Sequence, residues 1–246
     1  MSLTVKLLLT PVLVTQALRT RARLPRLPEA AGARQGVAGR SQPGAPLRLL
    51  LTGDSSAAGV GVGTQREALA GQLTQHLATH LHRPVHWRLL AQSGLTTAQT
   101  LHLLQRQDAQ ALGHFDVAVV MTGVNDVVEQ VPSTRAVRHR EALANHLRNA
   151  CGVQRVVFVP LPPVHQFPGL PQPLRWVAGS DARRHDQALR DWAATRDDVT
   201  RVDLDLQLNR GVMASDGFHP GPKAYQQFGR DIAAHLATLF AAPAAA

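Results

Sequence analysis

The fold is decided by Leu49-Leu50-Leu51-Thr52-Gly53-Asp54-Ser55, in which an apolar run stops at a glycine and continues with a carboxylate and a hydroxyl. This pattern is typical of a buried parallel strand that ends in a turn, and reactive groups gather at the carboxyl ends of such strands. Ser55 is therefore a candidate nucleophile, provided that a base, an orienting acid and oxyanion donors lie elsewhere in the chain. Without them, the same residues form a turn and a helix cap.

Segments with strand-like and helix-like patterns alternate through the rest of the chain. The predicted strands are the apolar runs 47–52, 85–90, 115–121, 155–159 and 200–204, and the predicted helices are 65–81, 96–107, 133–150, 180–195 and 221–240. Such alternation predicts a parallel sheet of about five strands with helices on both faces. The proline-rich segment 160–173 is expected to be a long, shaped loop.

The positive charge of the chain is concentrated near its start. The net charge is +9, but residues 1–48 hold eight Lys and Arg side chains against Glu29 alone, so the remainder is nearly neutral. No aromatic side chain lies among these arginines, which argues against a base-stacking surface. We therefore expect no nucleic-acid partner.

Residues 3–18 are mostly apolar but are interrupted by Lys6, Pro11 and Gln16, and they are too short for a confident bilayer span. The basic run 19–26 follows them, whereas a secretory signal places its positive charge first. Two interpretations stay open: a helix packed on the domain or lying in a membrane interface, and, less favoured, a partly cleaved export signal.

The Gly-, Ala- and Pro-rich residues 28–46 are interpreted as a linker. The predicted division is thus an arm and linker over residues 1–46 and a single domain over residues 47–246. The expected location is the cytoplasm, with peripheral membrane contact through residues 1–26 as an open alternative. The oligomeric state is not predicted.

Other polar groups follow the predicted strands or precede the last helix, and the ends of parallel strands meet at one edge of a sheet. His219 can take the proton of Ser55 and return it to a leaving group, and Asp216 can hold the other ring nitrogen. The N–H groups of Ser55 and Gly94 and the amide of Asn125 can bind an oxyanion. Each motif alone is more often a cap, an Asx turn or a charge pair. Their combination favours acyl transfer by a serine.

Metal and cofactor sites find little support in the sequence. A single cysteine, Cys151, excludes an internal disulfide and a cysteine-based zinc site. His76 and His80 are four residues apart, but no glutamate follows His76 as the zinc protease motif requires. The glycines at 59, 61 and 63 lack the Gly-Lys-Ser/Thr of a P-loop. We expect no metal and no cofactor.

Over residues 47–240 the chain resembles the SGNH or GDSL hydrolases, a family defined by Ser, Gly, Asn and His in four blocks. The residues that match these blocks are Ser55, Gly94, Asn125 within Gly-x-Asn-Asp, and Asp216 with His219. The resemblance implies a three-layer α/β/α flavodoxin-like fold and metal-free ester hydrolysis through an acyl-enzyme. One departure is Ser56, which replaces the family's leucine and is a rival hydroxyl.

The predicted function is therefore a serine esterase for small-molecule carboxylic esters with short-to-medium acyl chains. A lysophospholipase or thioesterase at a membrane surface and a carbohydrate acetyl esterase are alternatives within catalysis. A catalytically silent ligand-binding module of the same fold is the alternative outside it. Phe167 and Trp176 are candidates for lining the substrate pocket, with ordinary packing as the competing interpretation.

Overall fold

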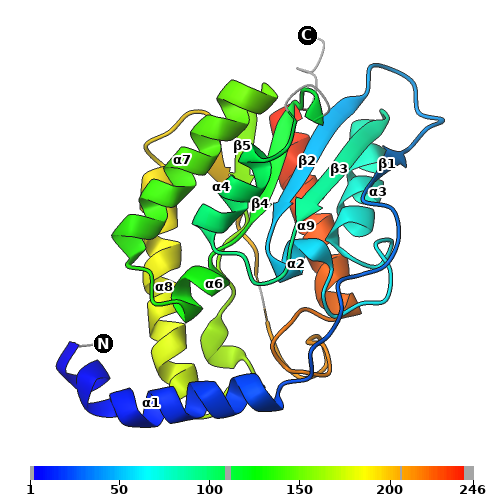
Figure 1. Ribbon diagram of the computed structural model, residues 1–246. Coiled ribbons are helices and arrows are strands. Elements are labelled where there is room, and N and C mark those ends of the chain that lie inside the picture. The colour runs from blue at the N-terminus through cyan, green and yellow to red at the C-terminus, as the bar shows by residue number, and fades with distance from the viewer. Residues whose placement is uncertain (1–2, 109–111, 206, 241–246) are drawn as a thin grey trace.

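The computed structural model describes residues 3–108, 112–205 and 207–240 and contains one mixed sheet between two layers of helices (Figure 1). The strands run in the order β1-β3-β2-β4-β5-β6. In the described residues they are β1 (Gln35–Ala38), β2 (Leu47–Gly53), β3 (Val85–Ala91), β4 (Val117–Met121), β5 (Arg155–Phe158) and β6 (Val199–Arg201). The last five are parallel, and their order is that of flavodoxin-like folds. The predicted three-layer fold class is confirmed.

The helices cover both faces of the sheet, as Figure 1 shows. Helices α3 (Leu69–Leu81) and α9 (Pro222–Phe240) pack together on one face, and α4 (Thr97–Gln105), α7 (Ser133–Cys151) and α8 (Leu174–Ala193) cover the other. The short helices α2 (Ser55–Ala58), α6 (Val124–Val128) and η1 (Val164–Gln166) follow β2, β4 and β5. Functional loops therefore gather at the carboxyl ends of the strands.

Strand β2 is buried on both faces. Leu47, Leu49, Leu50 and Leu51 are fully buried, because β2 lies between β3 and β4 and helices cover the sheet above and below. Burial of each leucine contributes about 1.5–3 kcal/mol. This burial explains why the segment before Ser55 reads as an unbroken apolar run instead of an alternating one.

The predicted linker differs from the structure, because part of it belongs to the sheet. Residues Gln35–Ala38 form β1, which pairs antiparallel with the edge of β3, and Ala30 is buried in the core. A Cβ at Gly36 would lie 3.2 Å from the indole nitrogen of Trp87, so a small residue fits where this ring covers the strand. A compact unit beginning at residue 47 would leave β3 with an open edge.

The first helix, α1 (Leu3–Arg23), lies against α8. Lys6 Nζ is 2.7 Å from a carboxylate oxygen of Asp181. The side chain of Gln16 donates to the carbonyl of Gln172 and accepts from the N–H of Leu174. Among the described helices, none is long and apolar enough to cross a membrane.

Candidate active site

The turn after β2 presents Ser55 at the start of a helix. Gly53 has φ +150°, and a Cβ there would lie 2.0 Å from the carbonyl oxygen of Met121 at the end of β4, so only glycine fits. The Asp54 side chain caps α2 by accepting the N–H of Ser56 at 3.0 Å. Since Asp54 performs the capping, the Ser55 hydroxyl is left for another partner.

Tyr225 supports this turn from α9. Its hydroxyl lies 2.8 Å from the carbonyl oxygen of Val60 and 3.1 Å from that of Ser56. Burial and the carboxylates of Asp54 and Asp216 raise the pKa of Tyr225 well above its usual value, so it remains a proton donor. The sequence offered no signal for this contact, which joins residues more than 160 positions apart.

His219 lies between Ser55 and Asp216. Its Nε2 is 3.0 Å from Ser55 Oγ, and its Nδ1 is 2.6 Å from Asp216 Oδ2. The other oxygen of Asp216 accepts the N–H groups of Phe218 and His219 at 2.9 and 3.0 Å. Burial raises the pKa of Asp216, but its hydrogen bonds with His219 and Phe218 outweigh this and leave that pKa below its usual value. Asp216 is thus an anion at neutral pH that fixes the imidazole ring.

The loop that holds His219 is stabilised by a hydrogen bond within the loop and by aromatic rings packed against it. Ala214 donates its N–H to the carbonyl of His219 at 2.8 Å. The Phe218 ring meets the His219 ring edge-on, with centroids 5.2 Å apart, and meets the Phe167 ring in the same way at 5.2 Å. These contacts restrict the orientation of the imidazole. Sequence reasoning missed Phe218, since a single aromatic between Asp216 and His219 has no distinctive pattern.

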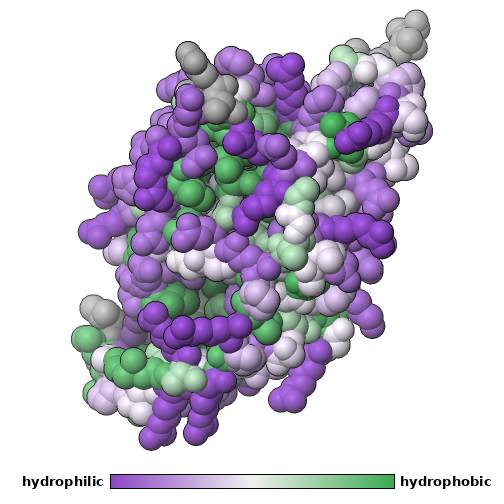
Figure 2. Space-filling model, turned by 45° about the vertical axis from the view of Figure 1, so that its right-hand side comes forward, coloured by the Kyte–Doolittle hydropathy of each residue, from purple (hydrophilic) through white to green (hydrophobic). Residues whose placement is uncertain are grey.

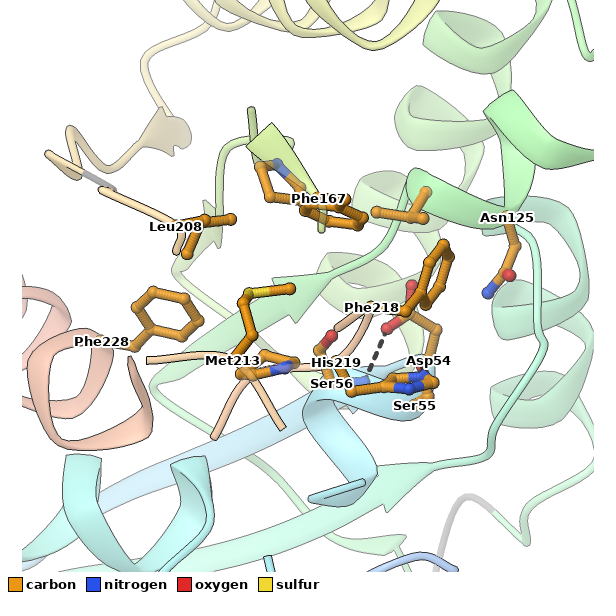
Figure 3. A pocket seen from close by; sticks show the side chains of 13 residues that line it. Asp54, Ser55, Ser56, Asn125, Phe167, Leu208, Met213, Phe218, His219 and Phe228 are labelled. Atoms are coloured by element: carbon orange, nitrogen blue, oxygen red, sulfur yellow. Dashed lines mark hydrogen bonds between the residues drawn. The ribbon is translucent and has the colours of Figure 1, made fainter. Parts of the chain in front are cut away.

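A pocket opens beside Ser55, with Ser56, Asn125 and His219 also in its wall (Figure 3). Its volume is about 30 Å³. The apolar part of its wall comes from segments far apart in the chain: Val124, Pro162, Phe167, Leu208, Met213, Phe218, Pro220 and Phe228. Phe167 therefore lies where the sequence suggested, whereas Trp176 is outside this wall and 44% exposed.

Asn125 and Gly94 occupy neighbouring loops at this edge of the sheet. Asn125 lines the pocket, and its amide nitrogen donates to the carbonyl of Leu95 at 3.0 Å, which leaves the second N–H of that amide available. Gly94 has φ +84°, and a Cβ there would meet nothing within 4 Å. Its loop is held at one end by the bond from Gln92 N–H to the carbonyl of Gly53. Gly94 does not itself line the pocket.

The segment before β1 holds the Gly94 loop from outside. Glu29 accepts both the N–H and the hydroxyl of Ser93, at 2.7 and 2.9 Å. Arg34 pairs with Glu29 at 2.9 Å and donates to the carbonyl of Ala91. Burial raises the pKa of Glu29, but its bonds from Ser93 and Arg34 outweigh this and lower it overall. The supposed linker thus supports the candidate site.

Behind Asn125, a buried polar cluster joins α6 to α4 and α7. Asp126 is fully buried and accepts the Thr97 hydroxyl at 2.6 Å. Arg140 is also fully buried, and none of its three side-chain nitrogens has a hydrogen-bond partner among the described residues. Burial lowers the pKa of Arg140, while the carboxylates of Asp126 and Asp186 act in the opposite direction. Within the described ranges, no group of three or more His, Cys, Asp or Glu side chains could hold a metal ion.

The geometry is that of a serine hydrolase, and comparison with known families agrees. The model of the GDSL-like lipase/acylhydrolase family matches residues 51–227. The chain belongs to this family. It is an ester-bond hydrolase, as the four blocks of its sequence predict. A comparison with curated proteins gives no match.

Several solved structures share the fold of this chain at low sequence identity. The lipase Lip_vut3 from a goat rumen metagenome has a TM-score of 0.60 and 18% identity, over 76% of this chain and 96% of that chain. TesA has a TM-score of 0.60 and 22% identity, over 78% and 99%. The acetylxylan esterase Axe2 from Geobacillus stearothermophilus, as a catalytic mutant, has 0.56 and 14%, over 76% and 92%. At these identities the likeness concerns the fold alone.

The buried carboxyl group of Asp54 makes the folding stability of this GDSL hydrolase depend on pH. Burial raises its pKa from 3.8 to about 7, although the N–H of Ser56 and the nearby His219 favour the anion. Between about pH 4 and 7 the folded state holds a proton here that the unfolded state has lost, so this group lowers stability as pH rises. Relative to wild type, Asp54→Asn is expected to gain roughly 1 kcal/mol of unfolding free energy per pH unit in this window.

Urea unfolding of both proteins at several pH values measures this difference. Asp191→Asn is the matched control, because that side chain is exposed and accepts a hydrogen bond from the neutral amide of Gln187, which an asparagine oxygen can also accept; the pH dependence seen with Asp54→Asn should be absent from this variant. A constant difference for Asp54→Asn as well would show that Asp54 is ionised in the folded state throughout.

Proposed function

We propose that the protein hydrolyses carboxylic esters through an acyl-enzyme formed on Ser55. The observation that supports this most is the hydrogen-bonded series Ser55–His219–Asp216, with distances of 3.0 and 2.6 Å, at the wall of an apolar pocket. Ser55 attacks the ester carbonyl while His219 takes its proton and passes it to the departing alcohol. A water molecule, deprotonated by the same imidazole, then releases the acid.

The oxyanion of each tetrahedral intermediate requires donors on the far side of the carbonyl from His219. We assign this role to the N–H of Ser55 at the start of α2, the N–H of Gly94 and the free N–H of Asn125. The contact of Asn125 with Leu95 supports the assignment, because it joins the Asn125 and Gly94 loops at one point. Such preorganised donors need no rearrangement as charge develops.

The proposed acyl group is short, from two to about four carbons. The pocket beside Ser55 has a volume of about 30 Å³, room for only a few heavy atoms when one water requires about 10–15 Å³ on this measure. Phe167 and Met213 bound this space and are 2% and 7% exposed, so they have little freedom to withdraw. A longer chain would have to displace packed side chains, which is costly in a close-packed interior.

A series of p-nitrophenyl esters tests this proposal. The acetate or butyrate should show the highest kcat/KM, with the octanoate lower by about tenfold or more, the cost of little more than 1 kcal/mol of strain. Met213→Ala should reduce the difference in kcat/KM between the short and the long esters, because it removes a thioether from the pocket wall. Preference of the wild type for octanoate would overturn the short-chain assignment, and no hydrolysis of any member would overturn the esterase assignment for these substrates.

Asn125→Ala tests the oxyanion assignment. Loss of one such donor is expected to lower kcat by about 10²–10³ with little change in KM, because the bond strengthens only as negative charge develops. Asn145→Ala is the control, since Asn145 lies on α7 and its amide oxygen accepts only from Arg196 at the surface. A rise in KM at unchanged kcat would instead assign Asn125 to ground-state binding.

A further inference from the structure

Helix α1 presents an apolar face to the solvent. Of the large apolar side chains that are exposed in the described residues, all but Val128 and Trp176 belong to this helix: Leu7 (63%), Leu8 (77%), Val12 (46%), Val14 (51%) and Leu18 (65%). Leu7, Val14 and Leu18 share one face by their helical spacing. Figure 2 shows apolar side chains gathered at the bottom of the molecule, where α1 lies. Exposed patches of this kind mark interaction sites.

Helix α1 carries apolar side chains both on the side that meets the domain and on the side that faces solvent, whereas a helix of a soluble protein usually keeps its outer side polar. Leu9 and Leu13 are half-buried and share the inner side with Lys6 and Gln16. Hydrogen bonds and an ion pair fix this helix on the domain. Lys6 pairs with Asp181 on α8, and Gln16 holds the chain at Gln172 and Leu174. These bonds keep Leu7 and Leu18 on the outside. The domain itself does not cover these two side chains, so a binding partner would have to remove them from water.

The charge of α1 and the residues after it indicates what covers that face. Arg19, Arg21, Arg23 and Arg26 are all exposed, and no acidic residue occurs before Glu29. A helix with an apolar face and arginines at its end, too short or too polar to cross a bilayer, is suited to the boundary between acyl chains and anionic headgroups. We propose that α1 binds the protein to the surface of an anionic lipid membrane, lying in the plane of the interface.

The position of α1 places the proposed esterase site near that surface. The carboxyl ends of the parallel strands point toward the end of the molecule along which α1 runs (Figure 1). The loop that supplies Pro162 and Phe167 to the pocket continues to Gln172, whose carbonyl binds Gln16 of α1. Trp176, 44% exposed in the first turn of α8, adds a side chain that favours the interface. This part of the inference rests on the proposed function, whereas membrane binding itself does not.

Flotation of the full chain with lipid vesicles tests the proposal. The protein should float with phosphatidylcholine vesicles that contain about one third phosphatidylglycerol, and only weakly with phosphatidylcholine alone, and added salt should weaken the binding. Arg19→Glu/Arg21→Glu should lower the partition coefficient by about 25-fold or more, since each arginine removed accounts for about fivefold and each glutamate adds repulsion from the anionic lipid. Leu7→Asn/Leu18→Asn should lower it by at least about tenfold.

The control for charge is Arg138→Glu/Arg230→Glu, which makes the same change of net charge at exposed sites on α7 and α9 and should leave binding close to wild type. Hydrolysis of soluble p-nitrophenyl acetate should be unchanged in the α1 variants, because α1 does not line the pocket. If the protein floats with the vesicles but does not hydrolyse the ester, the proposed esterase function is wrong and the proposed membrane binding still holds.

Three results would overturn the proposal. The first is absence of flotation with anionic vesicles, and the second is undiminished flotation of both α1 variants. The third is a wild-type dimer in sedimentation that Leu7→Asn/Leu18→Asn dissociates, because a second copy of the chain would then cover the apolar face of α1.

Discussion

Ser55→Ala is expected to lower kcat for p-nitrophenyl acetate by about 10⁴-fold or more, leaving only the rate that substrate binding and the oxyanion donors supply. The alanine removes the oxygen that lies 3.0 Å from His219 Nε2, so the acyl-enzyme cannot form. The turn should persist, because its cap is the Asp54 side chain and not the Ser55 hydroxyl. Urea unfolding measures that persistence, and a fluorophosphonate label located by mass spectrometry measures nucleophilicity.

Ser56→Ala is the matched control for the nucleophile. Ser56 contributes to the turn through its backbone, whose N–H binds Asp54 and whose carbonyl accepts from Tyr225. Loss of its hydroxyl should therefore leave kcat near the wild-type value and leave labelling at Ser55 intact. If Ser56→Ala were inactive while Ser55→Ala hydrolysed the ester, the nucleophile would be Ser56 and the assignment made here would be wrong.

Asp216→Asn is expected to lower kcat by about 10⁴-fold while the loop keeps its shape. The amide oxygen can still accept the N–H groups of Phe218 and His219. The amide nitrogen, in place of the oxygen 2.6 Å from Nδ1, would donate to that ring nitrogen. The imidazole would then carry its proton on Nε2, where it cannot accept one from Ser55. The developing imidazolium would also lose a neighbouring anion.

Steady-state kinetics of the single and double variants check this prediction. The proposed mechanism has Ser55, His219 and Asp216 act as one unit, so Ser55→Ala/Asp216→Asn should be no slower than Ser55→Ala alone. Asp203→Asn, in an exposed position, should be fully active. A loss for Asp216→Asn below about tenfold, or additive losses in the double variant, would mean that Asp216 does not act through His219.

Much of the fold and the candidate site could be predicted because the signals are local. The leucines of β2 are consecutive because both faces of that strand are covered, and Gly53 marks the end of β2 because a Cβ would strike Met121. The sequence offers Thr96 or Thr97 as the cap of the helix predicted over residues 96–107, and in the structure Thr96 caps α4. Asp216 and His219 lie on one turn, so their contact depends on three residues of chain.

Other features could not be predicted because they depend on distant partners. Strand β1 has four residues and no alternating pattern. It forms because the edge of β3 is open for pairing and because Gly36 leaves room for the Trp87 ring beside it. Helix α8 begins at Leu174 and not near residue 180, since the carbonyls of Pro171 and Pro173 accept the first helical N–H groups. Neither contact leaves a periodic trace in the sequence.

The sequence by itself determined the parallel sheet, the helices that cover it and which side chains are candidates for the reactive groups, because burial, capping and turn formation act over a few residues. Only the tertiary structure decided that His219 meets Ser55 across 164 positions. It also decided that side chains from distant segments, including Phe167 and Met213, form a small pocket, and that Leu7, Leu8 and Leu18 of α1 are exposed. The physical reason is that these features arise from packing between distant segments, whose geometry is set when the whole core forms.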